Sequence, residues 1–212
     1  MTKIDLEKQT FTTVNSEVNK VKFDGELTLN VTRAFDERLV KETIVDLVDE
    51  PTYAKLPDLK FKNGEIHVKV YSQLLTDAPE YARGFIGIAF RINEDDTEFE
   101  SFYVRPTNGR TSDPVRRLHA VQYFSYPDYK FHILREAAPN RYEAPADIGL
   151  GEWIDLRIVV EGDIGSIYIN QSPEPALVVN DLKLGESEGN IALWSEVGTD
   201  GYFKDLIIKT QD

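Results

Sequence analysis

Alternation of apolar and polar residues predicts β-strands along most of the chain. In residues 64–72, Ile66, Val68 and Val70 alternate with Glu65, His67 and Lys69. Successive side chains of a strand point to opposite faces, so this pattern is typical of a strand with one buried face. Similar runs predict strands at residues 26–33, 83–92, 99–106, 175–180, 190–196 and 201–209, and two strands joined by a turn at 161–163 within residues 153–171.

Turn residues separate nearly all of these runs. They include Asn63-Gly64, Gly162-Asp163, Gly185, Gly189, Gly198 and Gly201. Many short strands with few helices are typical of a β-sandwich. No repeat, low-complexity tract or linker interrupts the 212 residues, so we interpret residues 1–212 as a single domain.

The segment DERLVKETIVDLVDEP permits two interpretations. Val40, Ile44 and Leu47 have helical spacing, with Asp36 as a candidate cap and Pro51 after the end. Its β-branched residues also suit a strand. We expect a strand followed by a loop.

Residues 106–151 form the second exception, because five prolines punctuate them. We expect a long loop region with one or two short strands. The first lies around 119–125, and 131–134 is the position of the second if there are two. Ser112-Asp113-Pro114 resembles a helix start. A loop of this length is usually functional or disordered, and its aromatic residues argue against disorder.

Composition excludes several classes of function. The formal net charge of -13 argues against nucleic-acid binding, which requires a basic face. The absence of cysteine excludes disulfides and thiolate chemistry. The longest apolar run, GFIGIAF, is too short to span a bilayer, so we expect no membrane partner. The N-terminus lacks an apolar signal-peptide core, which predicts a cytoplasmic protein. A secreted chain whose leader had been removed would look the same, so secretion stays open.

Residues 104–124 gather basic side chains in this acidic chain, and Asp113 is the only acid among them. The basic residues are Arg105, Arg110, Arg116, Arg117 and His119. In one interpretation, ion pairs to acids elsewhere hold the loop in place, with Arg105 and Arg117 fully paired. In the other, the cluster lines a binding surface, because sugars are recognised by planar hydrogen-bonding groups and aromatic faces.

The second interpretation predicts a saccharide as the ligand and names its contacts. Trp194 lies opposite in alternation to Ile191 and Leu193, so we expect it to leave the core and stand at the edge of the site. A tryptophan packed at the rim of the core is the alternative. The expected ligand-binding residues are Arg105, Asn108, Arg110, Arg117, Gln122, Tyr123, Tyr126 and Trp194.

Several segments together resemble the concanavalin A-like lectin and glucanase superfamily, from about Phe11 to Lys209. They are FKNGEIHVKV, GFIGIAFRI, FYVRPTNGR, HAVQYFSYPDYKF, GEWIDLRIVVEGDIGSIYIN and NIALWSEVGTDGYFKDLIIK. Within the superfamily, the chain is most similar to bacterial laminin-G-like and 3-keto-disaccharide hydrolase-like, or family-16-glycosidase-like, modules. The resemblance implies an all-β jelly-roll sandwich of two antiparallel sheets, with a saccharide site over the concave sheet beneath residues 106–151.

The catalytic patterns of this superfamily are incomplete in the chain. Retaining glucanases carry an E-x-D-x-E pattern, whereas here Glu98 and Glu100 are followed by Phe102. Alginate-lyase-like members carry a tyrosine after Y-F-K-x-G, but Asp205 and Leu206 follow the Tyr-Phe-Lys run. The weak catalytic candidates are therefore His119, Glu98 and Glu100.

Three functional hypotheses remain open. The chain is a saccharide-binding module, a glycoside hydrolase or polysaccharide lyase acting on the same surface, or a structural or adhesion module without a small-ligand site. No spacing of metal ligands or cofactor motif is recognised, so we expect neither a metal nor a cofactor. The sequence does not predict the sugar, the linkage or the oligomeric state.

Overall fold

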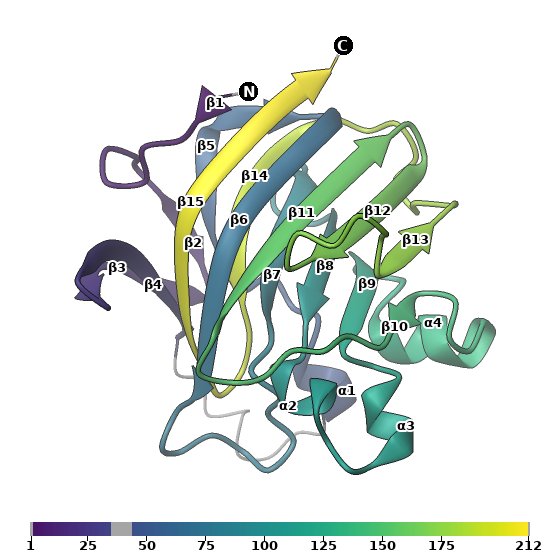
Figure 1. Cartoon of the computed structure of the whole chain (residues 1–212). Helices are drawn as coiled ribbons and strands as arrows, with labels where there is room; N and C mark the ends of the chain where they lie inside the picture. The colour runs from purple at the N-terminus through teal and green to yellow at the C-terminus, as the bar shows by residue number, and fades with distance from the viewer. Residues whose placement is uncertain (1, 35–43, 212) are drawn as a thin grey trace.

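The computed structural model of the chain describes residues 2–34 and 44–211, and it consists of two antiparallel sheets packed face to face (Figure 1). Sheet A has the strand order β13-β12-β11-β6-β15-β4-β3, and β1 also pairs with β15. Its strands are β1 (Thr2–Lys3), β3 (Ser16–Phe23), β4 (Glu26–Arg33), β6 (Asn63–Leu74), β11 (Trp153–Glu161), β12 (Ile164–Ile169), β13 (Leu177–Val179) and β15 (Thr199–Gln211).

Sheet B has the order β10-β9-β8-β7-β14-β5-β2. Its strands are β2 (Thr12–Val14), β5 (Tyr53–Phe61), β7 (Ile86–Ile92), β8 (Phe99–Val104), β9 (Val121–Tyr126), β10 (Glu143–Ala144) and β14 (Gly189–Ser195). The two sheets confirm the expected all-β sandwich. Every strand expected from alternation is present, whereas β3 and β5 are not predicted by the pattern.

Sheet B is buried on both of its faces. The inner face packs on sheet A, since a Cβ added to Gly165 of β12 would lie 2.9 Å from the ring of Phe102. The opposite, outer face carries an aromatic layer whose neighbouring ring centroids lie 4.8 to 5.7 Å apart. This aromatic layer consists of Tyr53, Phe99, Tyr103, Phe124 and Trp194, all fully buried.

The segment from Leu47 to Thr52 helps to close the aromatic layer off from solvent. Trp194 Nε1 donates a hydrogen bond to the Glu50 carbonyl at 2.9 Å, and Leu47 is itself fully buried. The segment begins in α1 (Ile44–Leu47), so the expectation of a strand and a loop is wrong for these residues. The remainder of that expectation, at residues 35–43, lies outside the described residues.

Residues 106–151 fold into short elements rather than a long loop. They are α2 (Pro106–Gly109), α3 (Pro114–Arg117), β9, α4 (Phe131–Ala137) and β10. The expected strand near 119–125 is confirmed by β9, but a strand at 131–134 is wrong. Phe131 and Leu134 bury one face of α4 at helical spacing.

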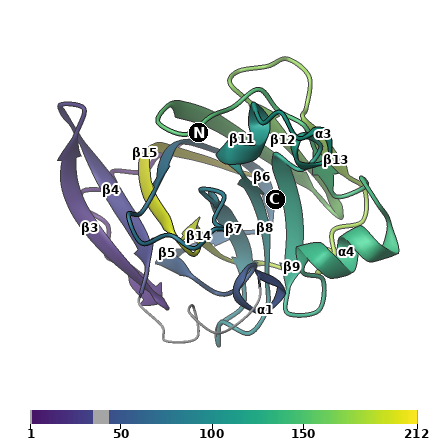
Figure 2. The ribbon, with the colours of Figure 1, turned by 90° about the horizontal axis from the view of Figure 1, so that it is seen from below.

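The helices place the site at one end of the sandwich. Helices α1, α2 and α3 gather at one end, and both termini lie at the other (Figure 1). Seen from the helical end, α4 lies beside β9 (Figure 2). Asp113 accepts hydrogen bonds from the backbone N–H groups of Val115 and Arg116, which confirms the expected cap of α3.

Candidate functional site

A small cavity at the helical end gathers four arginines. Its volume is about 140 Å³. The residues come from the segment before β7, the end of β8, α2, α3 and α4, which meet only in the fold. We call this cavity the arginine pocket, and it is lined by Arg83, Phe85, Arg105, Asn108, Arg116, His119, Phe131 and Arg135.

Arg105 is the most deeply buried arginine of the pocket, with 5% of its surface exposed. Its guanidinium lies over the rings of Phe85, Tyr103 and Phe131, at 5.8, 5.2 and 4.9 Å from their centroids. Its Nη2 donates a hydrogen bond to the Tyr103 hydroxyl at 2.6 Å. Its Nε is buried without a hydrogen-bond partner. The cation is therefore held mainly by aromatic faces, which leaves one donor unused.

Asp49 supplies negative charge behind Arg105. Its carboxylate accepts a hydrogen bond from the Phe131 backbone N–H at 2.5 Å. Burial raises the pKa of Asp49 to about 6, and the charge of Arg105 opposes that shift. Asp49 is therefore mostly ionised at neutral pH and compensates part of the charge of Arg105.

Asn108 and Arg116 form the wall contributed by α2 and α3. Asn108 donates to the His119 carbonyl at 3.0 Å and accepts from Arg116 Nε at 3.1 Å. Arg116 Nη2 also donates to the Thr107 hydroxyl at 3.2 Å. All of these partners are neutral, so they orient the guanidinium of Arg116 without cancelling its charge.

Arg83 is likewise held by neutral groups. Its Nη1 donates to the backbone carbonyls of Glu80 and Ala82 at 2.7 and 2.8 Å. Burial, followed by the charges of Arg116 and Arg105, lowers the pKa of Arg83. Within residues 2–34 and 44–211, no carboxylate lies within 4 Å of the guanidinium of Arg83 or Arg116.

Arg135 and His119 share one carboxylate, that of the buried Glu143. Arg135 binds it with two hydrogen bonds, from Nε at 2.7 Å and from Nη2 at 2.9 Å. His119 Nε2 lies 3.1 Å from Oε2 of the same group, the oxygen that also accepts from Arg135 Nη2. Burial lowers the pKa of His119, so its imidazole is neutral at pH 7. Among the described residues, Asp49 and Glu143 thus place negative charge near Arg105, and Glu80 does so near Arg83, while neither Arg83 nor Arg116 forms a salt bridge.

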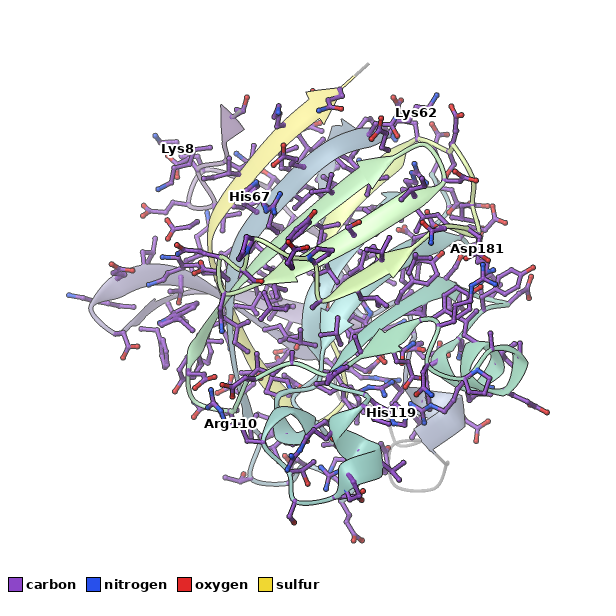
Figure 3. The ribbon with its side chains drawn as sticks, turned by 45° about the vertical axis from the view of Figure 1, so that its right-hand side comes forward. Lys8, Lys62, His67, Arg110, His119 and Asp181 are labelled. Carbon is purple, nitrogen blue, oxygen red and sulfur yellow. The ribbon has the colours of Figure 1, made fainter. Side chains whose placement is uncertain are left out.

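Two of the predicted arginines lie outside the arginine pocket. Arg110 is exposed and is bound by Asp147 at 2.6 Å and Glu152 at 2.8 Å. Arg117 donates to the Thr111 carbonyl and lines a separate open groove with Arg110. Figure 3 shows Arg110 and His119 on opposite sides of the unit formed by α2 and α3. The fold therefore separates residues that lie close together in sequence.

Three predicted ligand contacts are inaccessible, and their placement in a binding surface is wrong. Gln122, Tyr123 and Trp194 are fully buried. Gln122 donates to two backbone carbonyls, and Tyr123 donates to Glu100 at 2.6 Å. Trp194 belongs to the aromatic layer. The remaining aromatic candidate, Tyr126, is half-buried and stacks on Phe99 with 5.3 Å between ring centroids.

The carboxylate pair expected for glycosidase chemistry is not formed. Glu98 is exposed and precedes β8, whereas Glu100 is fully buried between the sheets. Glu100 accepts hydrogen bonds from Arg91 at 3.1 Å and from the Leu184 backbone N–H at 3.2 Å. With its carboxylate enclosed in this way, Glu100 has a structural role.

Sequence reasoning missed Arg83 and Arg135 as site residues. Arg83 directly precedes a strongly apolar run, and Arg135 lies on a helix that was expected to be a strand or loop. Neither position carries a local signal for the pocket. No group of three or more metal-ligating side chains is found among the described residues. Among those residues, no helix is long and apolar enough to cross a membrane.

Comparisons with known proteins show the fold of the chain. No family model matches the sequence, and no curated protein matches it. The carbohydrate-binding module CBM66 from Bacillus subtilis is 13% identical with a TM-score of 0.57, covering 95% of this chain and 96% of the module. A protein of unknown function with a galectin-like fold from Bacillus subtilis is 11% identical with a TM-score of 0.53, covering 97% of this chain and 90% of the other. The chain therefore has the predicted concanavalin A-like β-sandwich fold, which is also described as galectin-like.

Proposed function

We propose that the protein is a saccharide-binding module and that the arginine pocket holds the sugar. The observation that supports this most directly is that, among the described residues, Arg83 and Arg116 have no carboxylate partner in a cavity that Phe85 and Phe131 also line. Sugars are held by planar hydrogen-bonding side chains and by aromatic faces. A carbohydrate-binding module shares the fold, which agrees with this proposal.

The size of the pocket favours the end of a saccharide over its interior. A volume of about 140 Å³ corresponds to roughly five water molecules in the liquid. One sugar residue can enter such a cavity in part, whereas a chain passing through needs an open cleft. We therefore propose binding of a terminal residue. The relation to bacterial laminin-G-like and 3-keto-disaccharide hydrolase-like modules remains part of this proposal.

The experiment is a glycan panel measured by isothermal titration calorimetry on wild type, Arg116→Ala and Arg141→Ala. Arg141 is the matched control, because it is exposed and paired with Asp181 outside the pocket. We expect at least one saccharide to bind wild type and Arg141→Ala with equal affinity, and Arg116→Ala to lose at least about tenfold in affinity. A panel without any binder contradicts the proposal.

An enzyme acting at the same site is the second candidate, and the contact between His119 and Glu143 favours it. A neutral imidazole oriented by a carboxylate is the arrangement of a general base. Product analysis after incubation with the bound saccharide separates the two functions. Release of product that is lost in His119→Ala supports an enzyme, and binding without product supports a binding module.

The third hypothesis, a structural module, predicts that Arg105 and Arg117 are fully paired to acids. Arg105 instead donates to a tyrosine hydroxyl and Arg117 to a backbone carbonyl. Within the part of the chain that the structure describes, neither forms a salt bridge. This observation favours a ligand site over purely structural ties.

A further inference from the structure

The arginine pocket has the chemistry of an oxyanion site, and this deepens the proposed function on which it rests. We infer that the saccharide carries an oxyanionic substituent, either a carboxylate or a sulfate ester, and that this group enters the pocket between Arg105, Arg116 and Arg83. Three independent features carry the inference: a buried donor without a hydrogen-bond partner, guanidinium groups held by neutral partners, and the size of the cavity.

The unused donor belongs to Arg105. Only 5% of this residue is exposed, yet its Nε has no hydrogen-bond partner and its side chain lines the cavity. A buried donor left unpaired is unfavourable, and it is more so on a charged group. An oxygen placed in the cavity would complete the hydrogen bonding of Arg105, and an anionic oxygen would also balance its charge.

The guanidinium groups held by neutral partners are those of Arg83 and Arg116. Several other arginines of the fold do contact a carboxylate, as Arg91 contacts Glu100 and Arg110 contacts Asp147 and Glu152. Within the described part of the chain, Arg83 and Arg116 donate hydrogen bonds to backbone, amide and hydroxyl oxygens, and neither forms a salt bridge.

The positive charges of Arg83, Arg105 and Arg116 repel one another in the folded protein. Burial, followed by the charges of Arg116 and Arg105, lowers the pKa of Arg83, and the charge of Glu80 opposes this shift only in part. The chain contains 37 acidic residues, so a lack of available carboxylates does not explain the gap. Planar guanidinium groups bind carboxylate and sulfate oxygens through paired hydrogen bonds, and those of Arg83, Arg105 and Arg116 all line the cavity.

The cavity restricts the anion to a compact group. Its volume of about 140 Å³ admits one oxyanion with part of the sugar ring. The net charge of -13 disfavours the approach of long polyanions, because their charges would meet the acidic surface. A single charged sugar residue at a chain end satisfies both conditions.

The test compares sugars that share one ring and differ in the group at carbon 6, which is neutral in glucose and anionic in the other two. Calorimetry measures glucose, glucuronate and glucose 6-sulfate, with acetate and inorganic sulfate as probes without a sugar. We expect glucuronate or glucose 6-sulfate to bind at least about tenfold more tightly than glucose, and the better of the two identifies the source of the oxyanion. Raising NaCl from about 50 mM to about 500 mM should weaken that binding several-fold.

Two variants and a control assign the effect to the pocket. Arg116→Gln and Arg83→Gln remove the charge while keeping a polar side chain with a hydrogen-bond donor, and each should lose at least about tenfold for the anionic ligand. Arg141→Gln should leave binding unchanged. The Arg105 Nε–H resonance in a ¹⁵N spectrum of wild type reports the unused donor directly. It should shift when the anionic ligand is added, and an unmoved resonance at saturation would overturn the inference even where a variant fails to fold.

The outcomes separate this inference from the proposed function. Equal affinity for glucose and the anionic sugars, without an effect of Arg116→Gln, overturns the oxyanion inference and leaves saccharide binding standing. Binding of acetate or sulfate that requires Arg116, without binding of any sugar, supports the oxyanion site and overturns the saccharide function. Absence of binding by every ligand and probe overturns both.

Discussion

Glu100 offers a sharp test of whether the buried acid of β8 stabilises the fold. Its carboxylate accepts hydrogen bonds from Arg91, from the Tyr123 hydroxyl and from the Leu184 backbone N–H, and none of it is exposed. Glu100→Gln keeps the volume but replaces one acceptor oxygen by a donor. It also leaves the fully buried guanidinium of Arg91 without its carboxylate.

The expected cost follows from this geometry. Removing one partner of a buried ion pair costs about 3–5 kcal/mol. Arg91 retains hydrogen bonds to backbone carbonyls, among them those of Lys62 and Gly162, so we expect the lower end of that range. For a chain of 212 residues, a loss of about 3 kcal/mol lowers the Tm by roughly 6–12 °C. Urea and thermal unfolding followed by circular dichroism measure both quantities.

The matched control is Glu98→Gln, because Glu98 is exposed and lies just outside β8. Its free energy of unfolding should stay within about 0.5 kcal/mol of wild type. Equal stability of Glu100→Gln and Glu98→Gln would refute the structural role of the buried Glu100 carboxylate. It would also return Glu100 to the list of catalytic candidates.

Three further predictions follow from buried and capping groups. Burial raises the pKa of Glu196 to about 7 and that of Asp49 to about 6, both above the ordinary values of these acids. The folded state therefore binds their protons more tightly, and the stability they contribute is lost as the pH rises through 6–7. The free energy of unfolding should be larger near pH 5 than near pH 8, by on the order of 2 kcal/mol, and urea titrations that show the reverse would contradict this. In Trp153→Phe, the remaining Trp194 should fluoresce at short wavelength and resist acrylamide quenching with or without a saccharide, and strong quenching would place it outside the core. Asp113→Ala removes the cap of α3 and should cost about 1 kcal/mol. It should also weaken binding at the arginine pocket, so a lower Tm with unchanged affinity in calorimetry would show that α3 does not present the site.

Alternation of apolar and polar residues predicts strands well where one face of the strand is buried and the other faces solvent. It succeeds for β6 because its residues alternate between buried and half-buried positions. It misses β3, where Ser16 is the one buried residue and where the apolar residues Val18, Val21 and Phe23 do not alternate regularly. It also misses β5, where Pro57 interrupts the pattern at an exposed position. The sequence signal therefore depends on one-sided burial, which these two strands lack.

Trp194 shows a limit of the same reasoning. Its alternation correctly places it on the opposite face from Leu193, which pairs with Ile88 on the inner face of sheet B. Parity gives the face of the sheet, but it does not tell whether that face is open. Here the segment that includes Glu50 covers it, and this contact joins positions 144 residues apart. No local pattern could have predicted that burial.

The candidate site shows the corresponding limit for charge. The arginine-rich run contributes Arg105 and Arg116 to the pocket, but α2 and α3 direct Arg110 and Arg117 to a different surface. The remaining arginines come from distant segments. Proximity in sequence therefore predicts that arginines are concentrated at this end, and only the fold decides which of them share a cavity.

The closed outer face of sheet B determines where a ligand can bind. A saccharide lying across that face would need the aromatic layer to be accessible, and its rings are instead fully buried. The arginine pocket lies beyond the layer, where Arg105 leaves the end of β8 and reaches between Phe85 and Phe131. A site at the end of a sheet contacts the end of a ligand, whereas a site across a sheet contacts its length. The same covering that removes the broad sugar platform thus explains why a small, charged pocket for a terminal residue is the binding mode that this sandwich supports.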